Sequence, residues 1–138
     1  MPFTAPLISI VDDDRSVRRA LRRLVKSLGY DVETFASAEE FLDSAQAGRA
    51  ACLVLDIHMD GMSGFELKER LASGWAAIPV IFITAHDDPA TRDRVRQSGA
   101  AAYLSKPFDR SALLDAIGRA VSSGPKIEPP GAERDRVG

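Results

Sequence analysis

The chain has 138 residues, with 18 basic and 20 acidic side chains and a formal net charge of −2. This length predicts about one domain, which can bury a core without a disulfide or a structural metal. The fractions of hydrophobic residues (45%) and charged residues (28%) exclude a disordered or fibrous chain, and the negative charge disfavours a general nucleic-acid binder.

The single cysteine, Cys52, excludes an internal disulfide, and its apolar neighbours predict a buried side chain. No apolar stretch approaches the roughly 18 residues that a membrane helix needs. The first six residues lack the basic start and apolar core of a signal peptide. We therefore expect a cytoplasmic protein that makes no membrane contact.

Five short apolar runs are rich in branched residues and show little alternation, which is typical of strands buried on both faces of a parallel sheet. These runs span residues 7–11, 32–35, 52–55, 80–83 and 101–104. A helical pattern follows each run. After the first run, apolar residues from Val17 to Leu28 follow the i, i+3, i+4, i+7 spacing of an amphipathic helix, and Gly29 ends it.

The remaining helices have their own start and stop signals. Ser37 and Glu40 form a capping box for the second helix, and a shorter pattern at residues 65–71 predicts the third. Asp88, followed by proline, caps the fourth helix. Asp109 caps the fifth helix, whose apolar stripe consists of Leu113, Ile117 and Val121.

Five alternations of strand and helix predict an α/β fold of the (βα)5 type. Parallel strands joined by right-handed helical crossovers form a doubly wound, three-layer sandwich, as in flavodoxin-like folds. We place this domain at residues 7–122, after a short N-terminal arm at residues 1–6. Residues 123–138 are rich in proline, glycine and charge, which predicts a flexible tail or a truncated linker.

Ligands of such sheets bind beyond the carboxyl ends of the strands. Asp12 and Asp13 follow the first predicted strand, Asp56 follows the third, Thr84 the fourth, and Lys106 comes shortly after the fifth. The second strand ends without a reactive side chain, so we expect it at an edge. A sheet order of 2-1-3-4-5 would bring the other four ends to one site.

The charges at this site predict a metal ion. Three carboxylates bring three negative charges and the lysine returns one positive charge, while neighbouring carboxylates raise each other's pKa. A divalent cation would bring the sum to zero, and oxygen ligands favour Mg²⁺, or Mn²⁺, over zinc. A carboxylate beside such an ion, a hydroxyl and an ammonium group is the set that phosphoryl transfer requires.

Four segments carry a more specific signal. They are Val11-Asp12-Asp13, Leu55 to Met59 with Gly64, Ile83-Thr84-Ala85, and Tyr103 to Phe108 with its Lys106-Pro107 pair. With these segments the chain resembles the receiver domain of bacterial response regulators, whose fold is CheY-like, over about residues 7 to 122. The segment from Ile78 to His86 further resembles the FixJ-type branch.

The resemblance implies a role for each matching residue. Asp56 would be the phosphoacceptor and a metal ligand. Asp13 would bind Mg²⁺ directly, Asp12 would bind it through water, and His58 would lend its backbone carbonyl. Thr84 and Lys106 would hold the phosphoryl oxygens, with a cis bond between Lys106 and Pro107. Tyr103 would be an aromatic switch that turns inward when Thr84 moves toward the phosphoryl group.

The resemblance also implies a function, which is a phosphorylation-dependent switch in a two-component system or phosphorelay. Such a domain is not an enzyme but has intrinsic phosphotransfer and autodephosphorylation chemistry. It would accept a phosphoryl group from a histidine kinase or a histidine phosphotransfer protein. Phosphorylation would then change the surface of the fourth helix, fifth strand and fifth helix, through which a homodimer is expected.

Two departures from the family pattern affect this expectation. Asp60 stands where the family usually has proline, and Asp60 and Gly61 still predict a turn. The extra charge, together with His58 and His86, is expected to tune access to the site. No helix-turn-helix domain follows in the 16 residues after position 122, so we expect either a single-domain regulator or the receiver part of a DNA-binding regulator.

Other interpretations remain. The chain could be a phosphatase of the haloacid dehalogenase type with Asp12 as nucleophile and Asp14 as acid, although no acidic pair follows Lys106 and Asp56 would be idle. A flavodoxin-like binding module is disfavoured because three aspartates would repel phosphate. The basic residues between Arg15 and Lys26 indicate a solvated helix face or a kinase docking face, rather than direct nucleic-acid binding. Two histidines alone are a weak signal for a transition metal.

Overall fold

The computed structural model describes residues 5–44, 47–74 and 78–122. Most of the predicted arm and the whole predicted tail therefore lie outside the described residues. The strands are β1 (Leu7–Val11), β2 (Asp31–Phe35), β3 (Cys52–Asp56), β4 (Val80–Thr84) and β5 (Ala102–Ser105). The helices are α1 (Arg15–Lys26), α2 (Ala38–Asp43), α3 (Gly64–Gly74), α4 (Pro89–Ser98) and α5 (Arg110–Ser122), with a short 3₁₀ turn at Ala47–Arg49.

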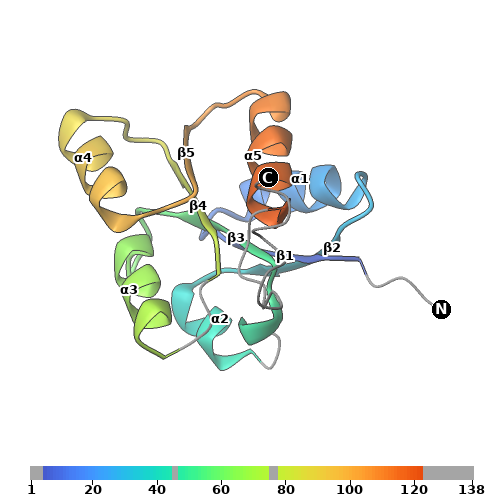
Figure 1. Ribbon diagram of the computed structural model, residues 1–138, viewed down its shortest axis with the longest axis horizontal. Helices are drawn as coiled ribbons and strands as arrows, with labels where there is room; N and C mark the ends of the chain where they lie inside the picture. The colour runs from blue at the N-terminus through green and yellow to red at the C-terminus, as the bar shows by residue number, and fades with distance from the viewer. Residues whose placement is uncertain (1–4, 45–46, 75–77, 123–138) are drawn as a thin grey trace, which may run out of the picture.

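The five strands form one parallel sheet in the order β2-β1-β3-β4-β5, which confirms the predicted topology. Residues of α1 and α5 pack on one face of the sheet, and residues of α2, α3 and α4 pack on the other. Figure 1 shows α1 and α5 together on one side, with α2 and α3 on the opposite side. No helix in the described ranges has the length and apolar character needed to cross a bilayer.

The central strand β3 shows why the apolar runs lack alternation. Cys52 and Val54 point toward α1 and α5, whereas Leu53 and Leu55 point toward the other helical layer, and all four side chains are fully buried. A strand covered on both faces needs apolar residues at every position. The Cys52 thiol is buried as predicted, and this burial raises its pKa to about 12.

Some helix boundaries differ from the predicted ones. Helix α1 ends at Lys26, so Leu28 lies beyond it and is 43% exposed rather than part of the apolar stripe. The chain reverses direction there because Gly29 adopts a φ of 97°. The Ser37 hydroxyl caps α2 by accepting the Glu40 N–H at 3.0 Å. The predicted capping box is only half formed, because the Glu40 carboxylate accepts the Ala36 N–H and not the Ser37 N–H.

Ser9 is an unexpected polar residue inside this core. Its side chain is fully buried in β1, and its hydroxyl has no hydrogen-bond partner among the described residues. A buried hydroxyl without a partner costs stability.

We therefore expect Ser9→Ala to raise the free energy of unfolding by about 1 kcal/mol in urea denaturation. The matched change Ser37→Ala removes a helix cap and is expected to lower it by about 1 kcal/mol; a loss of stability in Ser9→Ala would contradict this account.

Candidate functional site

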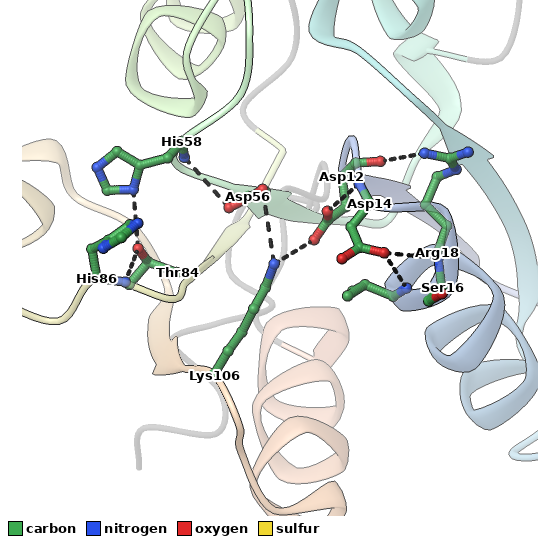
Figure 2. Close-up of polar contacts among 10 residues, drawn as sticks. Asp12, Asp14, Ser16, Arg18, Asp56, His58, Thr84, His86 and Lys106 are labelled. Atoms are coloured by element: carbon green, nitrogen blue, oxygen red, sulfur yellow. Dashed lines mark hydrogen bonds and ion pairs between the residues drawn. The ribbon is translucent and has the colours of Figure 1, made fainter.

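Three carboxylates meet at the carboxyl ends of β1 and β3. Asp12 and Asp13 follow β1 and Asp56 ends β3, and these strands pair so that Val11 lies opposite Leu55. One oxygen from each carboxylate lies within 4.8 Å of the others. Asp12 and Asp56, which Figure 2 shows, are buried, and Asp13 is exposed, so the group opens toward solvent on the side of Asp13.

Asp12 is fully buried, and both of its carboxylate oxygens are engaged. Oδ1 accepts the Asp14 N–H at 2.9 Å, and Oδ2 accepts from the Lys106 ammonium at 2.9 Å. The Asp12 carbonyl accepts from the Arg18 guanidinium at 2.8 Å, so one of the basic residues of α1 braces this turn. Asp12 therefore holds the lysine in place and has little freedom to attack a substrate.

Asp56 has looser contacts than Asp12. Its Oδ1 accepts the His58 N–H at 3.4 Å, and its Oδ2 lies 3.8 Å from Lys106 Nζ. Burial, and then the charge of Asp12, raise the pKa of Asp56 to about 7 against the opposing effect of Lys106. The repulsion was expected from the sequence, but burial is the larger cause. Asp56 is thus a carboxylate whose charge is poorly compensated by the protein alone.

The hydroxyl of Thr84, at the end of β4, is held on the side of the two histidines. Its oxygen accepts the His86 N–H at 3.0 Å and lies 3.1 Å from His58 Nδ1. The two imidazole rings meet edge to face with their centroids 5.1 Å apart. Figure 2 shows these three residues on one side of Asp56 and Lys106 on another.

The strand end that carries Lys106 is joined directly to that of Thr84. The Lys106 N–H donates to the Thr84 carbonyl at 2.7 Å, and the bond from Lys106 to Pro107 is cis, as the resemblance implied. Tyr103, in contrast, does not point toward the carboxylates. Its hydroxyl donates to Asp87 at 2.9 Å.

The loop from β3 to α3 forms the other wall of the site. Gly64 packs so closely that a Cβ there would lie 2.6 Å from the carbonyl oxygen of Asp56, so only glycine fits without a shift. Gly61 adopts a φ of 78°, consistent with the predicted turn after Asp60. Asp60 is exposed and lines a cavity of about 430 Å³ together with Asp13 and His58.

The phosphatase interpretation requires Asp14 as an acid, but the structure uses this residue as a helix cap. Asp14 is the N-cap of α1, where its Oδ1 accepts the N–H groups of Ser16 at 2.8 Å and Val17 at 3.2 Å. Its carboxylate is therefore committed to the helix, and Asp12 is engaged through both oxygens. Of the two buried carboxylates, Asp56 therefore has the weaker contacts, since its nearest recorded cation lies at 3.8 Å.

Two polar residues near the site were not singled out in the sequence. Glu39 of α2 accepts the Met62 N–H at 3.2 Å and so braces the β3–α3 loop. Asp87 connects Tyr103 to Arg92 of α4. Asp87 had one available signal: two aspartates precede α4, and a helix needs only one of them as its cap.

Comparison with known proteins identifies the family of this chain. The family described as "Response regulator receiver domain" matches residues 8–118. The chain belongs to this family. Nodulation protein W of Bradyrhizobium diazoefficiens is 42% identical over 114 residues, which are 83% of this chain and 50% of that protein.

Two further similarities place this receiver domain near FixJ. The transcriptional regulatory protein FixJ of Azorhizobium caulinodans is 37% identical over 128 residues, which are 90% of this chain and 60% of that protein. The crystal structure of FixJ-N is 33% identical, with 91% of this chain and 100% of that chain covered and a TM-score of 0.79. The chain thus spans between half and three fifths of the length of these two curated relatives.

The raised pKa of Asp56 predicts how stability depends on pH. The folded pKa of about 7 exceeds the ordinary value of 3.8, so the folded state favours the protonated carboxyl. This stabilisation is full below pH 3.8 and is lost as the pH rises through about 7. Without divalent metal, we expect the receiver domain to lose about 2 kcal/mol across this window relative to Asp56→Asn, measured by urea denaturation. Parallel curves for the two proteins would contradict the assigned burial and repulsion.

Proposed function

We propose that this receiver domain is a phosphorylation-dependent switch whose phosphoacceptor is Asp56. The observation that carries the proposal is the contrast between two buried carboxylates. Asp12 is engaged through both oxygens, whereas the nearest cation to Asp56 lies 3.8 Å away. The carboxylate whose charge is less compensated by hydrogen bonds and cations is the better nucleophile.

The phosphoryl donor is a histidine kinase or a histidine phosphotransfer protein. A carboxylate oxygen of Asp56 forms a bond to phosphorus as the bond from phosphorus to the donor's imidazole nitrogen breaks, and the electron pair stays on the imidazole. Lys106 holds one phosphoryl oxygen, and the Thr84 hydroxyl turns from His58 to donate to another. The product is an acyl phosphate that water later hydrolyses, so the domain acts as a switch and not as an enzyme.

The donor set also fits Mg²⁺, with Mn²⁺ as an alternative. Asp13 and Asp56 would bind the ion directly, His58 through its backbone carbonyl, and Asp12 through water. The fit is supported by three carboxylates within 4.8 Å, with Lys106 as their nearby counter-charge. When bound, the ion neutralises negative charge on the acceptor and on the phosphoryl group.

Three residues at the rim tune access to Asp56. His58 and His86 stand beside Thr84, and Asp60 adds a negative charge at the cavity that also contains Asp13 and His58. A reactant that carries negative charge is repelled by Asp60 more than it would be by the proline usual at this position. Asp60 is therefore proposed to slow phosphorylation.

The output of the switch is a changed surface on α4, β5 and α5. When Thr84 moves toward the phosphoryl group, Tyr103 turns inward and this surface can bind a partner or a second phosphorylated copy. We place the receiver domain at residues 7–122 in the cytoplasm, with residues 123–138 as a linker. In a longer natural protein, we expect an output domain that binds DNA; FixJ, to which this chain is similar, is a transcriptional regulatory protein.

The site of labelling tests this proposal. The protein is treated with a small-molecule phosphodonor and Mg²⁺, trapped by reduction of the acyl phosphate with borohydride, and mapped by peptide mass spectrometry. The label is expected on Asp56. A label on Asp12 would contradict the proposal and support the phosphatase interpretation.

A further inference from the structure

Asp87 joins three separate parts of the molecule through one carboxylate oxygen. It lies in the loop from β4 to α4, three residues after Thr84. Its Oδ1 accepts the Tyr103 hydroxyl of β5 at 2.9 Å and the Arg92 guanidinium of α4 at 2.8 Å. The loop, α4 and β5 therefore meet at Asp87, outside the group of carboxylates described above.

Helix α4 has few other attachments to the sheet. Val95 is its buried side chain, and Arg94 extends over the Phe65 ring of α3 with 4.3 Å to the ring centroid. Val95 belongs to the same core cluster against which the Tyr103 ring of β5 packs, so this connection is apolar. The Asp87 bridge is the polar connection between α4 and β5 in the described part of the chain, and Figure 1 shows α4 and α5 on the two sides of β5.

The Tyr103 end of the bridge is more than a surface contact. The ring packs against the core cluster on the α2–α4 side of the sheet, and only its hydroxyl reaches Asp87. Burial and the hydrogen bond to Asp87 raise the pKa of Tyr103 to about 12. The same hydrogen bond is the main cause that lowers the pKa of Asp87. It therefore favours the charged form of Asp87 and the protonated form of Tyr103.

We propose that Asp87 is a positioning residue that holds Tyr103 outward and ties α4 to β5 in the unphosphorylated state. This inference rests on the proposed function, because Tyr103 matters only if it must turn inward. Asp87 opposes that movement, since the hydrogen bond at 2.9 Å has to break first. Thr84 ends β4, directly before the loop that carries Asp87, so its displacement toward a phosphoryl group also displaces Asp87 and releases Tyr103.

The bridge therefore biases an equilibrium between two states. A contact present in only one state favours that state, and its removal favours the other. Loss of Asp87 is expected to favour the inward state and to tighten binding of a phosphoryl mimic. An exposed ion pair such as Arg92–Asp87 contributes little by itself, so the effect should follow the tyrosine contact.

The first experiment tests the bridge without reference to phosphorylation. Spectrophotometric titration of the tyrosines should show the Tyr103 pKa falling toward its ordinary value of 10 in Asp87→Ala. Tyr103→Phe identifies the transition that belongs to Tyr103. Asp93→Ala removes an exposed α4 carboxylate that pairs with Arg96, and it should leave the titration unchanged. An unchanged Tyr103 titration in Asp87→Ala would overturn the proposal.

The second experiment tests the positioning role. Beryllofluoride resembles a phosphoryl group and is titrated with Mg²⁺ present, while amide chemical shifts of α4 and β5 are recorded. Asp87→Ala should bind it about 3- to 10-fold more tightly than the unaltered protein and Asp93→Ala. Asp87→Asn should lie between them, because its amide oxygen still accepts the tyrosine hydroxyl.

The outcomes distinguish the positioning role of Asp87 from the proposed function of the domain. Equal affinity in Asp87→Ala and the unaltered protein, with a shifted Tyr103 titration, would overturn the positioning role and leave the proposed function intact. Failure of the unaltered protein to bind beryllofluoride would contradict the proposed function, and the positioning role with it. Tighter binding in Asp93→Ala as well would also overturn the role, since any loss of charge on α4 would then suffice.

Discussion

Replacement of Asp56 by asparagine is expected to abolish phosphoryl labelling of this receiver domain. An amide oxygen is a far weaker nucleophile than a carboxylate, and Asp12 cannot substitute because both of its oxygens are engaged. Labelling from a small-molecule phosphodonor with Mg²⁺, followed by intact-mass spectrometry, should fall by a factor of about 10³ or more.

The variant should fold at least as well as the unaltered protein. Asparagine has nearly the same shape as aspartate. The change also removes a buried carboxyl group, whose pKa is raised to about 7. Asp60→Asn is the matched control, because it makes the same change at an exposed carboxylate in the adjoining loop. Labelling of Asp60→Asn should persist or quicken. Undiminished labelling of Asp56→Asn would remove Asp56 from its proposed role.

The sheet order could be predicted because the chemistry of the strand ends was uneven. Four strands lead to a carboxylate, hydroxyl or lysine, whereas β2 leads to Phe35 and Ala36. A strand with nothing to contribute is expected at an edge, and β2 lies there. The apolar runs also predicted five strands buried on both faces, which is confirmed for β1, β3 and β4. It is wrong for the edge strands β2 and β5, which are partly exposed.

The sequence could not predict which carboxylate Lys106 pairs with more closely. Residue types predict one ammonium among three negative charges, but not that Lys106 lies 2.9 Å from Asp12 and 3.8 Å from Asp56. That difference arises because the Asp14 N–H fixes the orientation of the Asp12 carboxylate. The orientation of Asp12 therefore depends on the turn after β1. Asp56 lies at the equivalent end of β3, but its matching contact with the His58 N–H is longer, at 3.4 Å.

The positions of the two proposed switch residues could not be predicted from the sequence either. Thr84 and Tyr103 were predicted as a pair, yet each hydroxyl contacts a different neighbour, His58 and Asp87 respectively. Both contacts join side chains from separate elements, so no local spacing encodes them. A family pattern identifies which groups take part in a reaction, while the contacts that restrain them belong to this chain and require its structure.

Removal of the exposed carboxylate, by Asp13→Ala, is expected to weaken Mg²⁺ binding by roughly 10- to 100-fold. Asp13 is the member of the acidic group that faces solvent, so it is best placed to bind an entering ion directly. Titration of Mg²⁺ followed by amide chemical shifts measures the affinity. Asp60→Ala is the control, since it removes an equal charge from the same cavity but lies outside the acidic group.

Stability without metal distinguishes a lost ligand from a damaged fold. The charge of Asp13 raises the pKa of Asp56, so its removal relieves repulsion in the metal-free protein. Asp13→Ala should therefore be at least as stable as the unaltered protein without Mg²⁺, and it should gain less stability when Mg²⁺ is added. Unchanged affinity, or an equal loss in Asp60→Ala, would mean that Mg²⁺ responds to general negative charge rather than to a direct bond with Asp13.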